Sequence, residues 1–473
     1  MESQEFPLKK SVEKRFGKSF AKPLQQAKKY AIIKSNDILS YRKELYIMTT
    51  AELKATLLGG KFDERLTYIY GAEALEAQKA RYAKAVDEFA ALYGADRDAA
   101  LYSVAGRSEL SGNHTDHNHG CVVAASIDLD IIAVAAPSDT GVIRVKSEGF
   151  DEDVVDINAF TAPREVPLGH SDELIAGMVA GFRKDGYAVG GFDAYTTSNV
   201  LKGSGISSSA AFEDMIGNIL SHIYNGGKVD NVEIAKLAQY AENKFFGKPC
   251  GLMDQVACAV GGIVAIDFAD PAKPVIEKID FDITAAGYNL CITNTGGNHA
   301  DLTDDYASVP AEMKAIAASL GKGFLRDVCE EDVVKNIPAL REKHGDRAVM
   351  RALHFFAENR RVAMQKAALQ SGDLATFFEG VKASGRSSFC YLQNVYTTKN
   401  VSEQGVSLAL CLSDRLLADK AAAWRVHGGG FAGTIQAFVP SDFVPTYRAA
   451  MDAALGEGRC MVLRIRPVGA VKI

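Results

Sequence analysis

Apolar residues recur at helical spacing in several parts of the chain. Residues 75–93 place Tyr82, Val86 and Phe89 on one face, and Gly94 follows them as a plausible stop. Because residues three or four apart lie on the same side of a helix, this pattern predicts an amphipathic helix. The same reasoning predicts helices at 209–224, 232–246, 251–260, 347–370, 373–383 and 405–417.

Runs of apolar and β-branched residues predict strands between these helices. Residues 100–105 and 141–147 are short runs, whereas residues 121–137 form either one long buried strand or two shorter ones, since Asp128 and Asp130 interrupt them. Further short strands are expected near 289–294, 434–439 and 460–467. This order of elements predicts an α+β fold, and the glycines do not fit a dinucleotide-binding βαβ unit.

A chain of 473 residues suggests two or three domains. The net charge of −6 gives no general attraction to nucleic acid or to an anionic membrane. No apolar run approaches the roughly 18 residues that span a bilayer, and the N-terminus shows no secretion signal. The eight cysteines are scattered without a Cys-x-x-Cys pair, which argues against a zinc knuckle and a disulfide framework. These features predict a cytoplasmic protein.

Residues 1–47 differ in charge from the rest of the chain. They hold eleven Lys/Arg against five Asp/Glu, a balance of +6 that leaves −12 for the other residues. This basic N-terminal extension need not be well ordered. Three interpretations are open: an interaction arm, a solvated helical extension, or sequence translated ahead of a start at Met48. Because charge runs are usually solvated, the last two interpretations are favoured.

A polar loop at residues 106–120 carries His114, Asp116, His117 and His119 within six positions. So close a group could form a metal site, a catalytic histidine cluster, or a loop that hydrogen-bonds another ligand. The loop by itself leaves all three open.

Residues 203–212, Gly-Ser-Gly-Ile-Ser-Ser-Ser-Ala-Ala-Phe, lie where a loop becomes a helix. Glycines allow close approach to a ligand, and the free amides of a first helical turn attract phosphate. A serine hydroxyl there could also bind Mg²⁺. A glycine–serine turn with a serine N-cap explains the stretch equally well. The Gly-Lys-[Ser/Thr] ending of a Walker A loop is absent.

Two carboxylates are candidates for phosphoryl-transfer chemistry. Asp254 falls in the first turn of the helix predicted at 251–260, where the helix dipole favours its ionised form. Glu242 interrupts an apolar helix edge beside Ala241. A kinase needs one carboxylate on Mg²⁺ and another beside the attacking hydroxyl. Taken singly, each residue is better explained as an N-terminal acid or a solvated side chain.

A second glycine-rich stretch covers residues 427–433, His-Gly-Gly-Gly-Phe-Ala-Gly. Four glycines in six positions require unusual backbone angles or close approach to another surface. Considered alone, a tight loop without a ligand is the favoured interpretation.

Together these stretches resemble, in order, the galactokinase branch of the GHMP small-molecule kinase superfamily. Residues 106–118, Gly-Arg-Ser-Glu-Leu-Ser-Gly-Asn-His-Thr-Asp-His-Asn, are similar to the family's Gly-Arg-Val-Asn-Leu-Ile-Gly-Glu-His-Thr-Asp-Tyr-Asn. Residues 203–210 are similar to its Gly-x-Gly-Leu-Ser-Ser-Ser-Ala. Ala241-Glu242 and residues 250–255, Cys-Gly-Leu-Met-Asp-Gln, are similar to its Ala-Glu…Cys-Gly-Ile-Met-Asp-Gln. Residues 428–433 resemble its third glycine motif.

The resemblance implies a two-domain α+β GHMP-kinase fold, with domains at 48–285 and 286–473 and the active site in the cleft between them. It implies an ATP- and Mg²⁺-dependent sugar-1-kinase that converts galactose to galactose 1-phosphate and ADP. The implied partners are the sugar and ATP, without nucleic acid or membrane. The sequence does not indicate an oligomeric state.

The same resemblance assigns roles to single residues. Asp254 would orient or deprotonate the anomeric hydroxyl, Arg107 would stabilise charge near it, and Ser209 and Glu242 would hold Mg²⁺. The polar loop at residues 106–120, called the histidine-rich loop below, would bind sugar rather than metal. The sugar would be lined by Asn113, His114, Asp116, Gly251 and Tyr306. The ATP phosphates would be held by Gly203, Ser204, Gly205, Ile206, Ser207, Ser208 and Ser209, with Ser147 as a further nucleotide contact.

Among the departures from the family signature, Asn113 replaces its Glu, His117 its Tyr, and Glu109 its Asn. The family's Glu faces the C6 hydroxyl, so an amide there makes galacturonate or arabinose an alternative substrate. An Asn113→Glu exchange is expected to shift preference toward galactose. A catalytically silent sugar and ATP sensor is a second alternative. A mevalonate- or homoserine-type kinase is disfavoured, because His-Thr-Asp belongs to the sugar branch.

Overall fold

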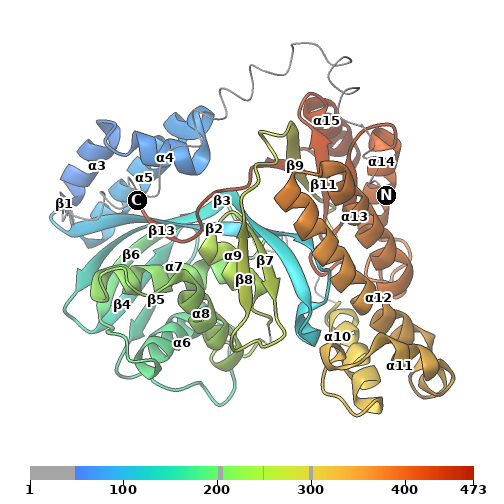
Figure 1. The fold of residues 1–473 in the computed structure, drawn as a ribbon. Coiled ribbons are helices and arrows are strands. Elements are labelled where there is room, and N and C mark those ends of the chain that lie inside the picture. The colour runs from blue at the N-terminus through green and yellow to red at the C-terminus, as the bar shows by residue number, and fades with distance from the viewer. Residues whose placement is uncertain (1–47, 201–205, 249, 298–301) are drawn as a thin grey trace, which may run out of the picture. The chain divides into compact units, whose positions relative to one another are not determined.

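Two sheets organise the part of the chain that the computed structural model describes, residues 48–200, 206–248, 250–297 and 302–473 (Figure 1). The nine-stranded sheet contains β1 (Met48–Thr49), β2 (Asp98–Ser111), β3 (Cys121–Ser138), β4 (Val142–Ser147), β5 (Glu152–Asp156), β6 (Gly191–Ser198), β7 (Ile263–Asp267), β8 (Val275–Ile279) and β13 (Val471–Lys472). The four-stranded sheet contains β9 (Tyr288–Asn294), β10 (Ala423–His427), β11 (Thr434–Pro440) and β12 (Cys460–Leu463).

β3 is the central strand of the larger sheet and pairs antiparallel with β2, β6 and β7. The order β1-β2-β3-β6-β4-β5 contains one parallel pair, β4 with β6. β1 and β13 both pair with β2. The smaller sheet has the order β10-β11-β9-β12 and is antiparallel throughout.

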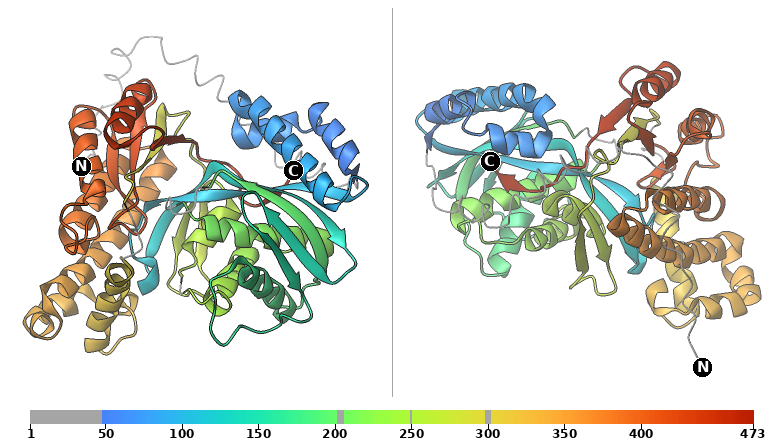
Figure 2. Two further views of the ribbon diagram at one scale, coloured as in Figure 1. Left: turned by 180° about the vertical axis from the view of Figure 1, so that it is seen from behind. Right: turned by 45° about the horizontal axis from the view of Figure 1, so that its top comes forward.

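Helices cover both faces of the larger sheet (Figure 2). Alternate residues of β3 belong to different cores: Ile132 and Val134 pack on one face, and Ile131 and Ala133 on the other, because side chains alternate along a strand. The first face carries α3 (Thr50–Leu58), α4 (Asp63–Tyr70), η2 (Ala72–Ala74) and α5 (Leu75–Tyr93). The second carries α6 (Ser171–Lys184), α7 (Ser208–Tyr224), α8 (Asn231–Lys244) and α9 (Met253–Val260).

Helices also cover the smaller sheet. α13 (Leu374–Ser387) packs on β10, while α14 (Gly405–Leu417) and α15 (Val444–Leu455) share a core with β11 and β12. Gly345, with φ of 81°, breaks α12 (Ile337–Ser371). The remaining elements are η3 (Asp116–Asn118), α10 (Thr303–Ser319), η4 (Leu325–Asp327), α11 (Glu330–Lys335) and the π-turn η5 (Ser388–Leu392).

The structure confirms the α+β fold class and the helices predicted at 75–93 and 405–417. Residues 121–137 form one strand rather than two. β2 is longer than the predicted 100–105 and continues to Ser111, so the first six residues of the expected polar loop are strand. This strand is buried, and its polar residues are tolerated there because each is paired with another polar group.

Residues 48–473 form one unit of the chain. The domain boundary between residues 285 and 286 stays a prediction. Val471 and Lys472, which that boundary assigns to the second domain, pair with β2 in the larger sheet.

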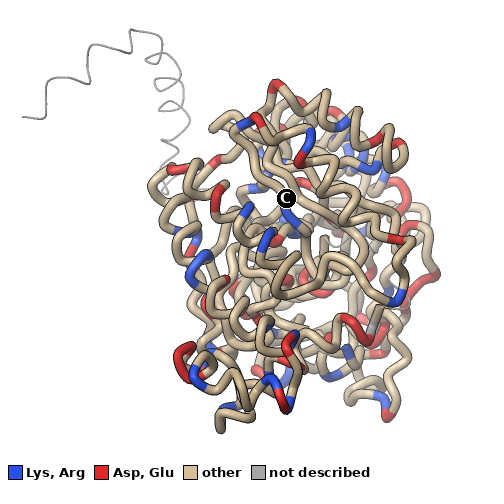
Figure 3. The backbone as a smooth tube through the Cα atoms, turned by 90° about the vertical axis from the view of Figure 1, so that its right-hand side faces the viewer, with Lys and Arg blue, Asp and Glu red and all other residues tan. Residues whose placement is uncertain are grey.

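Lys and Arg are interspersed with Asp and Glu over the described backbone (Figure 3). Within the ranges that the structure describes, no helix is long and apolar enough to cross a membrane. The basic extension at residues 1–47 lies outside these ranges.

Candidate active site

β2 brings Arg107 to the centre of the site. The pairing of β2 with β3 is irregular at Gly106, and a side chain there would lie 3.0 Å from the Ile206 carbonyl oxygen. The Arg107 amide donates to that same carbonyl at 3.2 Å. Because residue 106 has no side chain, β2 can approach Ile206, which lies in the stretch 203–209 predicted to hold phosphate and called the phosphate loop below.

Asp254 lies in the first turn of α9 and faces Arg107. Nε and Nη2 of Arg107 donate to Oδ1 and Oδ2 of Asp254 at 2.7 and 2.8 Å, which makes a bidentate pair. Burial raises the pKa of Asp254, but the Arg107 charge and the hydrogen bonds from Arg107 and Ser207 hold it below its usual value. The carboxylate is therefore ionised at neutral pH, as a general base must be.

The end of the predicted phosphate loop lies against this pair. Ser207 precedes α7 with φ of 62° and donates its hydroxyl to the Asp254 carboxylate. The turn at residues 206–209 and the carboxylate of Asp254 are thus in contact. Gly203, Ser204 and Gly205 lie outside the described residues.

Glu242 and Ser209 converge beside this turn. The side chain of Glu242 is 2% exposed, and its Oε1 accepts from the Ser209 hydroxyl at 3.3 Å. Lys248 Nζ lies 2.7 Å from the same oxygen, and Gln255 Nε2 donates to Oε2 at 2.8 Å. A hydroxyl and a carboxylate are hard oxygen donors of the kind Mg²⁺ prefers.

No group of three or more His, Cys, Asp or Glu side chains is arranged to hold a metal ion in the ranges that the structure covers. The histidine-rich loop therefore provides no such group. A divalent cation at Ser209 and Glu242 would take its other ligands from phosphate and water, which is usual for Mg²⁺ at nucleotide sites.

The histidine-rich loop contains a chain of polar contacts. His114 Nε2 lies 2.9 Å from the Gly429 carbonyl oxygen, and His114 Nδ1 lies 3.0 Å from His117 Nε2. Because a carbonyl only accepts, His114 carries its hydrogen on Nε2 and accepts one from His117. His117 Nδ1 lies 3.1 Å from Asp116 Oδ1. Asp116, His117 and His114 therefore form a continuous chain of polar contacts that ends at the Gly429 carbonyl.

Burial and the neighbouring His117 lower the pKa of His114 to about 3. His114 is therefore neutral at physiological pH and offers a fixed donor and a fixed acceptor. Its φ of 59° is unusual for a residue with a side chain, and the surrounding contacts hold it there.

Gly251 lies directly against this loop. A side chain at residue 251 would place its Cβ 2.2 Å from Asp116 Oδ2. A side chain at residue 251 would therefore displace the Asp116 carboxylate, so Gly251 lies in direct contact with the histidine-rich loop, three residues before Asp254.

The late glycine loop at residues 427–433 supports the same region. Its successive carbonyls accept hydrogen bonds from Asn113, His114 and Tyr306, at 2.7, 2.9 and 2.7 Å. A side chain at Gly430 would lie 1.9 Å from the Asn394 carbonyl oxygen. Contacts with other parts of the protein therefore account for the backbone of this loop.

Asn113 has no exposed surface. Besides the late glycine loop, its amide nitrogen contacts Glu109 Oε1 at 3.3 Å. Its amide oxygen accepts from Ser388 and Asn394 at 3.1 and 2.8 Å. Protein groups therefore saturate this side chain, and a sugar hydroxyl could reach it only by replacing one of them.

Ser147 ends β4 and accepts a hydrogen bond from Thr196 of β6 at 2.9 Å. β6 leads toward the phosphate loop. A nucleotide contact of Ser147 stays a prediction.

Sequence reasoning missed Lys248 and Gln255 as partners of Glu242. The available signal for Lys248 was its position six residues after Glu242, in the gap between two matched motifs. Gln255 follows Asp254 directly, so it could have been considered with the catalytic acid.

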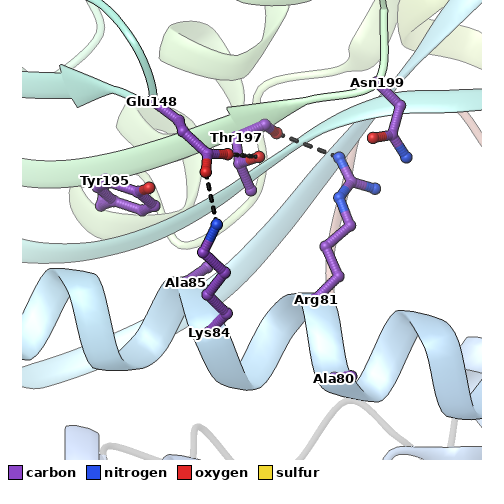
Figure 4. A pocket seen from close by; sticks show the side chains of 8 residues that line it. All are labelled: Ala80, Arg81, Lys84, Ala85, Glu148, Tyr195, Thr197 and Asn199. Atoms are coloured by element: carbon purple, nitrogen blue, oxygen red, sulfur yellow. Dashed lines mark hydrogen bonds and ion pairs between the residues drawn. The ribbon is translucent and has the colours of Figure 1, made fainter.

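A hollow of about 380 Å³ between α5 and the larger sheet lies outside this site (Figure 4). Lys84 and Arg81 reach into it from α5, and each already has a partner. Lys84 pairs with Glu148 at 2.6 Å, and Arg81 donates to the Thr197 carbonyl at 3.2 Å. None of the predicted site residues lines this hollow.

Two protein-family models match the chain in the region of the site. Residues 87–137 match the galactokinase galactose-binding signature, which includes β2 and the histidine-rich loop. Residues 173–262 match the GHMP kinases N terminal domain, which spans α6 to α9.

Similar curated proteins carry the name galactokinase. The galactokinase of Streptomyces coelicolor is 31% identical over 391 residues, covering 80% of this chain and 94% of that protein. The galactokinase of Mycobacterium tuberculosis strain H37Rv is 30% identical over 346 residues, covering 72% of this chain and 89% of that protein.

Solved structures share the fold. Lactococcus lactis galactokinase complexed with galactose aligns with a TM-score of 0.71 and 23% identity, covering 83% of this chain and all of that one. Methanococcus jannaschii mevalonate kinase aligns with a TM-score of 0.54 and 14% identity, covering 77% of this chain and 98% of that one.

Proposed function

This chain belongs to the galactokinase family of the GHMP kinases, and we propose that it transfers a phosphoryl group from ATP to the anomeric hydroxyl of galactose. The products are galactose 1-phosphate and ADP. The observation that carries this proposal is the Arg107–Asp254 pair, which meets Ser207 at the start of α7. A carboxylate, a guanidinium and a helix N-terminus together supply what phosphoryl transfer asks of a protein.

Asp254 orients the anomeric hydroxyl and accepts its proton. Its lowered pKa keeps it ionised before the reaction. Arg107 holds the carboxylate in place and stabilises the negative charge that develops on the transferring group. The Ser207 hydroxyl keeps the carboxylate against the turn from which the nucleotide phosphates are held.

The sugar is bound by the loop that contains His114 and Asp116, with Gly251 and Tyr306 completing the site. Asp116 accepts hydrogen bonds from sugar hydroxyls, and its contact with His117 supports the orientation of its carboxylate. The hydrogen bond from Tyr306 to the late glycine loop ties residues far apart in the sequence to one site.

The nucleotide phosphates lie at the turn of residues 203–209, with Ser147 as a further contact. Ser209 and Glu242 would hold Mg²⁺, which would supply neutralisation of the phosphate charge. The hydroxyl and carboxylate oxygens that converge there support this assignment.

We place the active site between domains at 48–285 and 286–473. Residues of the first part supply Arg107 and Asp254, and Tyr306 with the late glycine loop comes from the second. A reduced cytoplasm is the proposed location, because all eight cysteines are free.

Replacing Asp254 by Asn tests the proposal. The amide keeps the size of the side chain but cannot accept the hydroxyl proton. We expect turnover to fall about 10³-fold, within the range that general base catalysis contributes. A coupled ADP-release assay measures turnover, and calorimetry with ATP measures binding, which should be retained. If the Asp254→Asn variant kept more than a tenth of the normal turnover, Asp254 would not be the general base.

Galacturonate is the second candidate substrate. Asn113 is uncharged and buried, so residue 113 presents no carboxylate toward C6. A panel of galactose, galacturonate and arabinose with MgATP identifies the sugar by kcat/KM. Binding of sugar and ATP without ADP release from any of them would favour the silent sensor.

A further inference from the structure

Lys248 lies beside the two residues proposed to hold Mg²⁺. It follows α8 and precedes α9, two helices that pack on α7 (Figure 1). Its ammonium nitrogen is 2.7 Å from Glu242 Oε1, the same oxygen that accepts from the Ser209 hydroxyl. One carboxylate oxygen is thus shared by a lysine cation and the other proposed metal ligand.

The carboxylate of Glu242 needs a cation at this oxygen. It is almost completely buried, and its other oxygen accepts from the neutral amide of Gln255. A buried carboxylate without a positive partner is strongly unfavourable. Lys248 is the cationic partner of Glu242 in the structure, and it reaches the carboxylate from solvent, with 58% of its side chain exposed.

An ammonium and a divalent cation cannot both bind Oε1 closely, because their charges repel over a short distance. Mg²⁺ bound by Ser209 and Glu242 would need the position that faces both oxygens. The long, flexible lysine side chain can leave this position, since most of it is solvated and its ammonium makes no other hydrogen bond among the described residues.

We propose that Lys248 occupies the divalent-cation position in the nucleotide-free protein, so that metal binding is an exchange of one cation for another. This inference rests on the proposed function, because it takes Ser209 and Glu242 as the metal ligands. The exchange lowers affinity for free metal and favours metal that arrives with ATP. The phosphates then provide a new anionic partner for the displaced ammonium, near Asp254.

Replacing Lys248 by Met removes the ammonium and keeps an unbranched side chain. Mn²⁺ serves as the probe, because it binds oxygen ligands and its electron paramagnetic resonance signal reports the bound fraction. We expect the nucleotide-free variant to bind Mn²⁺ at least tenfold more tightly than the unmodified protein. Unchanged or weaker Mn²⁺ binding would overturn the proposal.

Two further variants assign the effect to this site. Adding Glu242→Gln to Lys248→Met should abolish the gained Mn²⁺ binding, and its persistence would overturn the proposal. Lys236→Met is the matched control, because Lys236 pairs with Glu233 on the surface of α8, 3.6 Å away. It should leave Mn²⁺ affinity unchanged.

Thermal unfolding gives a readout independent of metal titration. Lys248→Met leaves Glu242 without a cation, so its unfolding temperature should fall in EDTA and recover in Mg²⁺. A loss that Mg²⁺ does not reverse would show a purely structural ion pair and would overturn the exchange. These measurements use no sugar and no turnover. Their failure is therefore distinguishable from failure of the kinase proposal, which the Asp254→Asn assay decides.

Discussion

Asp214 in α7 is a buried carboxyl group that the proposed mechanism does not use. Both of its oxygens are buried and have no hydrogen-bond partner among the described residues. Burial raises its pKa well above the ordinary value. The folded protein therefore binds a proton there that the unfolded chain releases above pH of about 4.

This proton gives stability a defined pH dependence. Between the unfolded pKa and the raised folded pKa, the folded state holds more protons, so the free energy of unfolding falls as pH rises. Asp214→Val should remove this loss and raise the unfolding temperature at pH 8 more than at pH 4. Thermal unfolding across that range checks it. Equal shifts at both pH values would contradict the assignment.

His117 connects His114 to Asp116 in the proposed sugar loop. His117→Phe removes both contacts while keeping a ring. A charge-assisted hydrogen bond contributes about 1.5–3 kcal/mol, so the KM for sugar should rise at least about tenfold. Steady-state kinetics should show no change in the KM for MgATP.

The control for this variant lies in the same loop. His119 stacks on Phe324 with ring centroids 3.7 Å apart and adopts φ of 62°. His119→Asn suits that backbone conformation and should leave the sugar KM within about twofold of normal. A comparable effect of both variants would mean that loop packing, rather than the His117 contacts, sets sugar affinity.

At the level of elements, the start of α9 and the sugar loop meet through a glycine. Gly251→Ala places a methyl group where Asp116 Oδ2 lies. The Asp116 carboxylate must leave its present position, so we expect a rise in sugar KM of about tenfold or more with the fold retained. Gly323→Ala is the control, because a side chain there meets no atom within 4 Å. Unchanged sugar kinetics in Gly251→Ala would show that the contact is unimportant.

The sequence predicted elements well where one face alone is buried. The helix at 75–93 has a clear apolar stripe and a glycine stop, and its ends match the structure. β2 was underestimated because its polar residues satisfy one another inside the protein. α10 was not predicted, since Pro310 and a weakly apolar face hide its helical pattern.

For the site as well, the sequence predicted residues within short motifs but not the contacts between segments far apart in the chain. The motifs identified Arg107, Glu242 and Asp254, and the structure brings the first and last into contact. The contacts that hold Asn113 and Tyr306 to loop 427–433 join residues more than a hundred positions apart. No local pattern encodes such pairs, so the role of that loop as a support emerged only from the structure.

For the whole molecule, a buried network of charges joins the larger sheet to the second half of the chain. Arg425 of β10 is fully buried and pairs with Glu109 of β2. It also donates to Ser384 of α13 at 2.7 Å. Glu358 of α12 lies 3.7 Å from Arg425 and pairs with Arg361 at 2.6 Å. Two carboxylates and two guanidinium groups balance each other.

Because of this charge balance, an Asn113→Glu variant is expected to change the stability of the protein as well as its sugar preference. The new carboxylate would lie beside Glu109 in the interior, so the single variant should lose about 3 kcal/mol or more of stability. Glu109→Asn together with Asn113→Glu restores the charge count and should recover the unfolding temperature. Sugar preference is then measured as the galactose-to-galacturonate ratio of kcat/KM in the double variant. Full stability of the single variant would contradict this account.

The segment 465–473 contacts β2. Val471 pairs with Ser103, and the Ile473 amide donates to the Leu101 carbonyl at 2.9 Å. Arg466 adds a hydrogen bond to Ser103 at 2.7 Å. A ribosome makes this segment long after the strand that carries Arg107. The growing polypeptide therefore cannot complete its catalytic strand until translation has passed these positions, and nascent or prematurely terminated products should be inert.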